Sequence, residues 1–293
     1  MSAPSASEPL ALGALYIVAT PIGNLGDITL RAIETLRTVS MIVAEDTRHS
    51  RTLLKHLGID TPMSAYHEHN EAREAPRLVR RMLDGASIAL ISDAGTPLLS
   101  DPGARLVAAA VDAEVRVIPI PGASALLSAL VACGISTEQF TFLGFLPRKG
   151  GDRAHALRSI ARSPITMVLY ESPQRIAATL DDLIRGGAGG RHAALARELT
   201  KRFEEVRRGT IADLRSGIGD GVKGEIVLVI AGAVASAASE EDARDVVTRM
   251  RSEGASSRDI ISRLTDELGV PRNTAYKLAH SPPESPPDSS PAG

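Results

Sequence analysis

The sequence predicts an α/β protein in which two α/β domains are followed by a small helical domain. Short apolar runs rich in Val and Ile alternate with helical segments in the first half of the chain. The same alternation returns more loosely in the second half, and the composition changes near residue 236. With 293 residues, of which 43% are apolar, the chain is long enough to form two packed domains.

The first domain is predicted over residues 14–125. Runs that are apolar throughout are typical of parallel strands that are covered on both faces. Four such runs are expected to form strands, at 14–19, 40–45, 87–92 and 115–120. An apolar stripe at helical spacing over residues 30–36 indicates a helix after the first strand. Another helix is expected over residues 102–113, with Asp101 as its N-cap and Pro102 at its first position.

The second domain is predicted over residues 126–235. Five runs are expected to form strands, at 140–145, 165–170, 192–197, 204–210 and 224–232. Helical segments at 151–162 and 173–186 separate the first three of these runs. The pattern is looser than in the first domain, which favours a mixed sheet.

A helical domain is predicted over residues 240–280, after a linker rich in Ala and Ser. Gly269 is expected to end one amphipathic helix and Pro271 to open the next, a pattern that resembles a helix-turn-helix. Arg272 and Lys277 lie on the second of these helices. They are expected to contact nucleic acid; the alternative is that the two helices are purely structural.

Composition limits the class of protein. The net charge of −2 argues against a polycation but leaves room for a local basic face. A single cysteine, Cys133, no secretory signal and no apolar run of about 18 residues lead us to expect a cytoplasmic protein without a membrane span. His67 and His69 lack a third ligand at a familiar spacing, so we expect no metal site. Residues 1–13 and 281–293 are expected to be disordered.

Loops of small residues follow three of the predicted strands, at 19–27, 91–103 and 121–125. They are expected to form one crevice, because the carboxyl ends of parallel strands meet at the same edge. The first loop lacks the three glycines of a dinucleotide fingerprint, and Pro21 has no N–H to offer a phosphate. The crevice therefore suits a flat, cationic, phosphate-free cofactor. In the second loop we expect residues 93–99 to face this ligand and residues 100–103 to be structural.

Seven motifs of the chain resemble those of the tetrapyrrole methylase superfamily, in the same order. They are VATPIGNLGD, VAEDTR, YHEHNE, SDAGTPLLSDPG, PGAS, GFLPRK and YESPQRI, and the resemblance covers residues 14–232. It implies two α/β domains with S-adenosylmethionine bound in the cleft between them. Carried over residue by residue, it places this cofactor against Pro21, Ile22, Gly23, Asp93, Ala94, Gly95, Thr96, Leu99, Ala123, Ser124, Ala125 and Tyr170. Porphyrin-type members carry GxGPGD where this chain has TPIGNLGD, so a different substrate is expected on that side.

Within the superfamily the motifs are most similar to the branch that acts on ribosomal RNA. This similarity implies 2′-O-methylation of a cytidine ribose in the decoding region of 16S rRNA, with 16S rRNA in the 30S subunit as the partner and a homodimer as the assembly. The residues expected to contact RNA are Arg148, Lys149, Arg153, Arg175, Arg197, Lys201, Arg272 and Lys277. The alternative is that these side chains form a charged surface that faces solvent and binds no RNA.

Methyl transfer to a hydroxyl needs positioning, and a base that takes the proton accelerates it. Candidates for this base lie at Glu45 and Asp46, which end or follow a predicted strand, in the motif YHEHNE at 66–71, and at Arg197, Glu198 and Lys201. The resemblance adds Glu171, which it places beside the cofactor, and we take Glu45, Asp46 and Glu171 as the candidate catalytic residues. For Asp46 the alternative is a helix cap or a loop brace. Two other functions stay open: a small-molecule, tetrapyrrole-type methylase of the same superfamily, and a DNA-binding regulator whose large domain senses a ligand.

Overall fold

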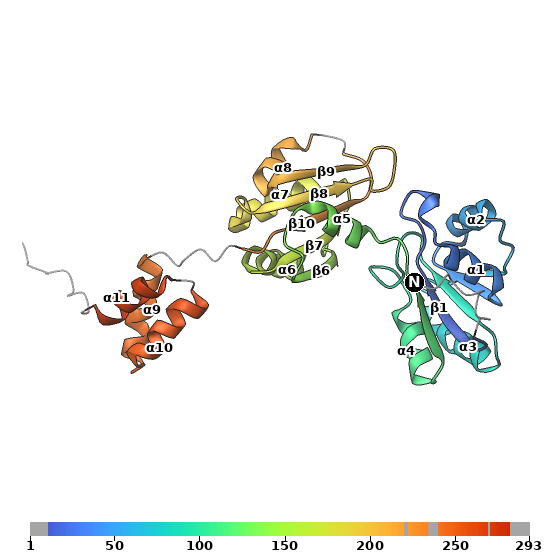
Figure 1. The fold of residues 1–293 in the computed structure, drawn as a ribbon, viewed down its shortest axis with the longest axis horizontal. Coiled ribbons are helices and arrows are strands. Elements are labelled where there is room, and N and C mark those ends of the chain that lie inside the picture. The colour runs from blue at the N-terminus through green and yellow to red at the C-terminus, as the bar shows by residue number, and fades with distance from the viewer. Residues whose placement is uncertain (1–10, 220–221, 234–239, 269, 282–293) are drawn as a thin grey trace, which may run out of the picture. The chain divides into compact units, whose positions relative to one another are not determined.

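The computed structural model describes residues 11–219, 222–233, 240–268 and 270–281. The chain forms two compact units, residues 1–231 and residues 232–293 (Figure 1). The first unit contains two five-stranded sheets with interleaved helices, so the predicted α/β class is confirmed. Residues 1–10 and 282–293, which make up most of the two ends predicted to be disordered, lie outside the described residues. None of the helices in the described ranges is long and apolar enough to cross a membrane.

The first sheet is parallel throughout, as predicted, and has the strand order β3-β2-β4-β1-β5. Its strands are β1 (Ala14–Val18), β2 (Met41–Ala44), β3 (Met63–Ala65), β4 (Ile88–Ile91) and β5 (Arg116–Ile120). Sequence analysis missed β3, because this strand has only three residues, lies at an edge and is half-buried. It therefore lacks the long apolar run that marked the other four strands.

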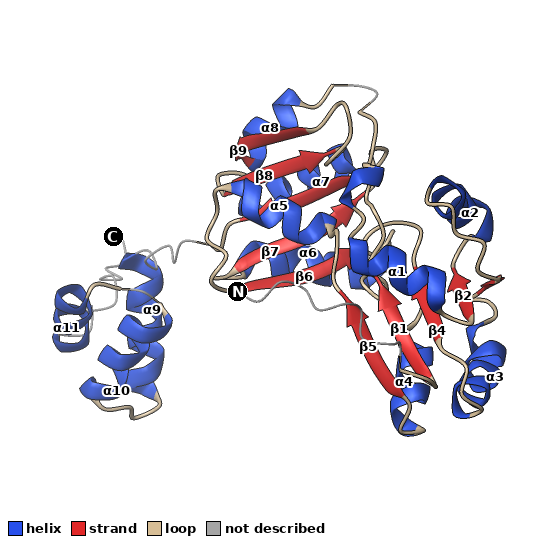
Figure 2. Ribbon diagram, turned by 45° about the vertical axis from the view of Figure 1, so that its right-hand side comes forward, coloured by secondary structure: helices blue, strands red, loops and turns tan. Residues whose placement is uncertain are grey.

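Helices cover both faces of this sheet (Figure 2). After a 3-10 turn at Leu25–Asp27 the helices are α1 (Leu30–Thr38), α2 (Thr47–His56), α3 (Glu71–Leu83) and α4 (Ala104–Asp112). Residues of α1 and α2 share a buried cluster with Ile42 of β2, whereas residues of α3 and α4 share another with its neighbour Val43. Successive side chains of a strand point to opposite faces, so each strand packs against both helical layers.

The start of α4 differs from the prediction. The helix begins at Ala104 with Gly103 as its cap residue, so Asp101 is not the N-cap and Pro102 is not helical. The physical reason is the close approach of Gly103 to β4. A Cβ atom on Gly103 would lie 2.6 Å from Cδ2 of Leu90, and φ is +136°, where other residues are disfavoured. The helix starts only after this glycine, and Asp101 stays in the loop.

The second sheet has the strand order β6-β7-β10-β8-β9. Its strands are β6 (Phe140–Phe145), β7 (Thr166–Glu171), β8 (His192–Arg197), β9 (Glu205–Thr210) and β10 (Ile226–Ile230). β6 and β7 are parallel and the other pairs are antiparallel, so the sheet is mixed, as predicted.

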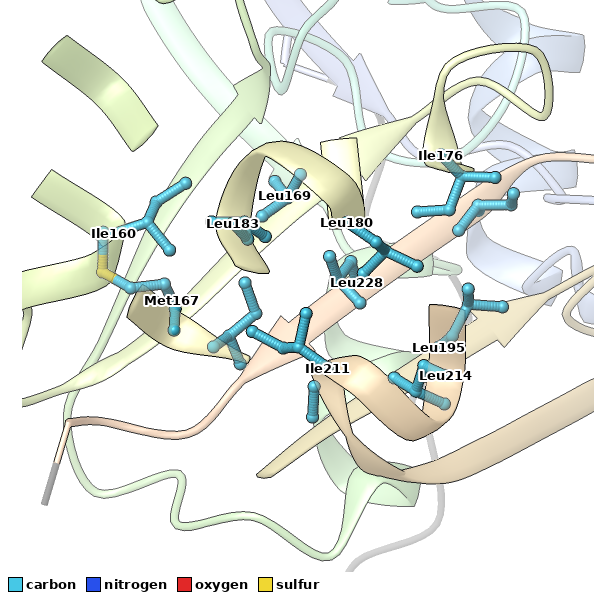
Figure 3. Close-up of a cluster of buried hydrophobic side chains, with 14 of the residues drawn as sticks. Ile160, Met167, Leu169, Ile176, Leu180, Leu183, Leu195, Ile211, Leu214 and Leu228 are labelled. Carbon is cyan, nitrogen blue, oxygen red and sulfur yellow. The ribbon is translucent and has the colours of Figure 1, made fainter. Parts of the chain in front are cut away.

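Helices also cover the second sheet. They are α5 (Ala125–Cys133), α6 (Gly150–Arg162), α7 (Ile176–Leu183), which continues as a π-helical turn at Ile184–Ala188, and α8 (Ile211–Gly217). Leu228 of β10 packs with residues of α6, α7 and α8 in a large buried cluster (Figure 3). Its neighbours Val227 and Val229 pack with residues of α5 on the opposite face. The sheet is therefore buried on both sides, and polar chemistry is confined to its edges.

The C-terminal unit consists of helices with a core of their own. The helices are α9 (Glu240–Ser252), α10 (Ser257–Ser262), which continues as a π-helical turn at Arg263–Glu267, and α11 (Arg272–His280). The buried side chains are Ala243, Val247, Ile260, Leu264, Val270, Ala275, Leu278 and Ala279. α10 and α11 are the pair predicted to form a helix-turn-helix, whereas Gly269, predicted to end the first of them, lies outside the described residues.

Candidate active site

A cavity of about 580 Å³ opens within the unit of residues 1–231, a size typical of small-molecule sites. Loops at the carboxyl ends of the strands of the first sheet line it together with residues at strand ends of the second sheet. β10 runs antiparallel to β7 and β8, so Ile226 at its start pairs with Glu171 and Arg197 at their ends. The lining residues are Ile22, Glu45, Asp93–Asp101 except Pro97 and Leu98, Ser124, Ala125, Phe145, Tyr170–Pro173, Lys201 and Gly224–Val227.

The loops after β1 and β4 are joined by backbone hydrogen bonds. The N–H of Thr20 donates to the carbonyl of Gly95 at 2.8 Å, and the N–H of Gly95 donates to the carbonyl of Thr20 at 3.0 Å. Gly95 has φ of +77°, and a Cβ atom there would lie 3.2 Å from Cγ2 of Ile22. This position therefore requires glycine both for its backbone conformation and for the narrow space beside Ile22.

Backbone strain is concentrated in two segments that contribute to the cavity. Among the described residues, five residues other than glycine have positive φ. Leu98 and Ser100 belong to the loop after β4, and Glu198 and Thr200 belong to the segment after β8 that carries Lys201. Such conformations cost of order 1–3 kcal/mol each and cluster at functional sites.

Most of the residues predicted to contact a cofactor come together on this cavity. Nine of the twelve line it: Ile22, Asp93, Ala94, Gly95, Thr96, Leu99, Ser124, Ala125 and Tyr170. Pro21, Gly23 and Ala123 do not. Gly23 packs against the stem of Lys201, and the carbonyl of Ala123 accepts a hydrogen bond from the hydroxyl of Thr96 at 3.3 Å. Contact of these residues with a ligand stays a prediction.

The three candidate catalytic carboxylates have different environments. Glu45 lines the cavity, and burial and then the charge of Asp93 raise its pKa. Asp46 is not among the lining residues and caps α2 by accepting from the N–H of Arg48 at 2.8 Å. Hydrogen bonds from the side chain and backbone of Arg48 lower the pKa of Asp46 to about 2. This geometry fits the helix-cap alternative for Asp46.

Glu171, at the end of β7, has a side chain with 0% exposure. Its Oε1 accepts from the N–H of Ser172 at 2.9 Å and lies 3.3 Å from Nε of Arg175. Its Oε2 accepts from the hydroxyl of Thr179 at 2.7 Å. Both oxygens are thus held by residues of the segment 172–179, an arrangement that favours a structural role over proton transfer.

Comparison with known proteins places this chain in a family. The family of Tetrapyrrole (Corrin/Porphyrin) Methylases matches residues 14–215. The chain belongs to the tetrapyrrole methylase family. Relatives named ribosomal RNA small subunit methyltransferase I include one from Synechocystis sp., 46% identical over 272 residues, which are 92% of this chain and 98% of the relative. Another, from Mesorhizobium japonicum, is 50% identical over 231 residues, which are 78% of this chain and 79% of the relative.

Solved structures share the fold of this tetrapyrrole methylase. A cobalt precorrin-4 methyltransferase has a TM-score of 0.57 at 16% identity, covering 75% of this chain and 95% of its own. The uroporphyrin-III C-methyltransferase from Thermus thermophilus, complexed with S-adenosyl homocysteine, has a TM-score of 0.55 at 19% identity. The match covers 74% of this chain and 96% of that structure's chain. At such identities the likeness concerns the fold.

Sequence analysis missed several lining residues of the methylase. Asp101 was interpreted as a helix cap, although it follows a strand at the ligand-binding edge, and this position was the available signal. Burial and then the nearby charge of Glu45 raise the pKa of Asp101 to about 7. Residues 224–227 could not be found from the sequence, because only the antiparallel pairing of β10 brings the start of that strand to the cavity.

The basic residues predicted to contact RNA fall into two groups. Arg148 and Lys149 are exposed just before α6, and Arg272 and Lys277 are exposed on α11 in the C-terminal unit. The other four are held by protein partners. Arg153 pairs with Asp182 at 2.7 Å, Arg175 donates to the carbonyl of Leu146 at 2.7 Å, Arg197 pairs with Glu205 at 2.5 Å, and Lys201 pairs with Glu198 at 3.0 Å. Contact with RNA stays a prediction for all eight.

Replacing Glu171 by Ala distinguishes its structural and catalytic roles. The change leaves the N–H of Ser172 and the hydroxyl of Thr179 without their acceptor in a buried place, so the free energy of unfolding should fall by about 1–3 kcal/mol. Urea unfolding measures the change. The matched control is Glu225→Ala, whose side chain is 75% exposed and whose loss should change stability by less than about 0.5 kcal/mol. Unchanged stability of Glu171→Ala with loss of activity would contradict the structural role.

Proposed function

We propose that this protein transfers a methyl group from S-adenosylmethionine to the 2′-hydroxyl of a cytidine ribose in the decoding region of 16S rRNA. The observation that carries the proposal is the length of the match to relatives named ribosomal RNA small subunit methyltransferase I. A match over 92% of the chain reaches well into residues 232–293, whereas the structures of porphyrin and precorrin methyltransferases cover 74–75% of the chain. The match to the Synechocystis relative thus includes a large part of the helical C-terminal unit.

The residues of the cavity fit S-adenosylmethionine. Small residues at 94–96 and 124–125 let a ligand approach the backbone closely. Carboxylates on the wall come from Glu45, Asp93, Asp101 and Glu225, and the ammonium group of Lys201 is already paired with Glu198 and Glu225. Such a wall attracts a cationic sulfonium and disfavours a phosphate. This charge supports a phosphate-free, cationic cofactor at this place.

Bound S-adenosylmethionine supplies an electrophilic methyl group. The task of the chain is to orient this group and the ribose hydroxyl, and holding two reactants in line contributes up to about 7–11 kcal/mol to lowering the barrier. The hydrogen-bonded pair of loops at Thr20 and Gly95 provides a rigid frame for this purpose. Apolar wall residues such as Leu99 and Ile226 exclude water from the reacting atoms.

Exposed aromatic and basic side chains support an RNA substrate. Phe145 lines the cavity and is 55% exposed, and Phe203, close in sequence to the lining residue Lys201, is 67% exposed. The guanidinium of Arg202 lies 5.6 Å from the centroid of the Phe203 ring. Unpaired bases stack on such rings, and stacking contributes about 1–3 kcal/mol per base. Arg148 and Lys149 would contact phosphates outside the acidic cavity.

The remaining parts of the proposal follow from the substrate. We place 16S rRNA in the 30S subunit as the partner, and we expect the protein to act in the cytoplasm, where ribosomal subunits are assembled. Arg272 and Lys277 on α11 are proposed to contact RNA as well. A homodimer, which the family resemblance implies, stays a prediction that light scattering would test.

The direct test of the function is a transfer assay with radiolabelled S-adenosylmethionine. The protein is incubated with 30S subunits, with naked 16S rRNA, with a precorrin and with duplex DNA, and the label is mapped. We expect label on a cytidine ribose of 16S rRNA. Label on the precorrin would support a small-molecule methylase, and DNA binding without any transfer would support a regulator; either result contradicts the proposal.

Replacing Gly95 by Val should remove cofactor binding while the protein stays folded. The side chain would enter the narrow space beside Ile22 at a backbone conformation that a β-branched residue disfavours. We expect the affinity for S-adenosylhomocysteine, measured by calorimetry, to fall at least about 100-fold, which corresponds to about 2.7 kcal/mol. The control is Gly58→Val, which has φ of +62° and nothing within 4 Å of its Cβ position. Equal affinities of the two variants would refute this role of Gly95.

Replacing Phe203 by Ala should weaken RNA binding selectively. Loss of one stacked base predicts a rise in the Kd for RNA of about 5- to 100-fold. The affinity for S-adenosylhomocysteine should be unchanged, because Phe203 is not among the residues that line the cavity. Phe140→Ala is the control, since this exposed side chain begins β6 and Phe145 at the cavity ends it. Filter binding with 30S subunits measures both variants, and a Phe203→Ala variant as tight as Phe140→Ala would contradict the stacking role.

A further inference from the structure

We propose that Asp101 is the general base that takes the proton from the ribose hydroxyl during methyl transfer. This inference rests on the proposed function and adds to it the residue that moves the proton. It replaces the structural role that the sequence predicted for Asp101, since α4 begins only at Ala104.

The position of Asp101 suits a group that meets substrate. It lines the cavity from the loop after β4, at the carboxyl edge of the first sheet. The preceding residue, Ser100, has φ of +75°, and its hydroxyl packs so closely on Gly144 of β6 that a Cβ there would lie 2.7 Å away. Gly103 is held against Leu90 on the other side. The loop thus holds Asp101 in place between two close contacts with the sheets.

The other carboxylates of the cavity already form hydrogen bonds or ion pairs within the protein. Asp93 accepts a hydrogen bond from the N–H of Asp46 at 3.1 Å, so it joins the loop after β4 to the loop after β2. Glu171 is held on both oxygens, and Glu225 is largely exposed and pairs with Lys201 at 3.4 Å. Within the described part of the chain, no cation forms an ion pair with Asp101 or with Glu45. Asp101 and Glu45 are therefore the carboxylates left for proton transfer.

The pKa of the carboxyl group distinguishes Asp101 from Glu45 as a candidate base. Burial first and then the charge of Glu45 raise the pKa of Asp101 to about 7, and the charges of Asp93 and Glu225 act in the same direction. A hydrogen bond from Ser92 acts against them. Lys201 and Tyr170 also line the cavity and complete the titratable groups that face this region. A base is most effective when its pKa lies near the working pH, so Asp101 has the suitable value and Glu45 tunes it.

The proton-transfer step balances without another reactant. The ionised carboxylate of Asp101 accepts the proton of the 2′-hydroxyl. The hydroxyl oxygen forms the new bond to the methyl carbon, and the bond from that carbon to sulfur breaks with its electron pair left on sulfur. Asp101 ends protonated and releases this proton to solvent after the products leave.

Replacing Asp101 by Asn tests the proposal in the full-length protein with 30S subunits. We expect kcat to fall about 10²- to 10⁴-fold, with unchanged affinity for S-adenosylhomocysteine by calorimetry and for 30S subunits by filter binding. Asp60→Asn, at an exposed position, is the matched control and should keep wild-type activity. A kcat within a few-fold of wild type would overturn the proposal. Loss of S-adenosylhomocysteine binding would also overturn it, because Asp101 would then be a cofactor ligand.

The Glu45→Gln variant tests the role of Asp101 through the pH dependence of kcat/KM, which would not change if Asp101 were only structural. For the wild type, kcat/KM should rise with pH through a midpoint near pH 7, as the Asp101 carboxyl ionises. Removing the negative charge of Glu45 makes that ionisation easier, so the midpoint should shift to lower pH, by about 1 unit for a close carboxylate neighbour. If the midpoint of the pH profile were the same in Glu45→Gln as in the wild type, the profile would not report ionisation of Asp101 and the proposal would be overturned. A wild-type protein that labels no RNA would instead refute the proposed function, so the two failures are distinguishable.

Discussion

The parallel pairing of β1 with β4 is the constraint on which the rest of the site depends. Leu15 pairs with Ile88, and beyond the ends of the strands Thr20 and Gly95 form a separate antiparallel bridge of two hydrogen bonds. This pairing holds the loop after β4 beside the loop after β1, where the cavity opens. Both loops contribute lining residues to the cavity, among them Ile22 and Ser100, and the backbone of Ser100 is strained.

The charge of the cavity follows from this anchoring. Carboxylates from the loops after β2 and β4 and from the segment just before β10 face a common space, and the charges of Glu45, Asp93 and Glu225 all raise the pKa of Asp101. Because the pKa of Asp101 is raised above that of an unfolded chain, its ionisation as the pH rises toward 7 opposes folding. A bound cation offsets this repulsion, so the same charges that disfavour the empty fold favour a sulfonium ligand.

The arrangement of the two sheets explains why polar chemistry collects at one place. Helices pack on both faces of each sheet. In β10, for example, Leu228 packs in the cluster on one face and its neighbour Val227 in the cluster on the other. The residues that line the cavity come from loops and from the ends of strands. The edge of the first sheet and the antiparallel junction of β7, β8 and β10 supply both walls of the cavity.

Much of the fold and part of the site could be predicted from the sequence. The runs recognised in the sequence predicted each strand of the described residues except β3, which is too short and only half-buried, and they include the largely polar run that forms β9. The resemblance of the motifs to the tetrapyrrole methylase superfamily predicted the nine cofactor candidates that line the cavity, and the convergence of loops after parallel strands explains why those of the first sheet lie together. Asp101 was assigned to the wrong role, since a Ser-Asp-Pro-Gly sequence before an apolar stripe has the pattern of a helix start, and the contact between Gly103 and Leu90 that delays α4 is long-range.

The sequence by itself indicated most of the strands and several of the helices, because the period of apolar residues depends on neighbours along the chain. It also determined which loops are made of small residues that admit a ligand. Only the tertiary structure decided which carboxylates lie together, that Glu171 is held by Thr179 while Asp101 faces the cavity, and that the start of β10 belongs to the site. The physical reason is that burial and charge–charge interaction depend on distances in space, and strand pairing sets those distances between residues far apart in the chain.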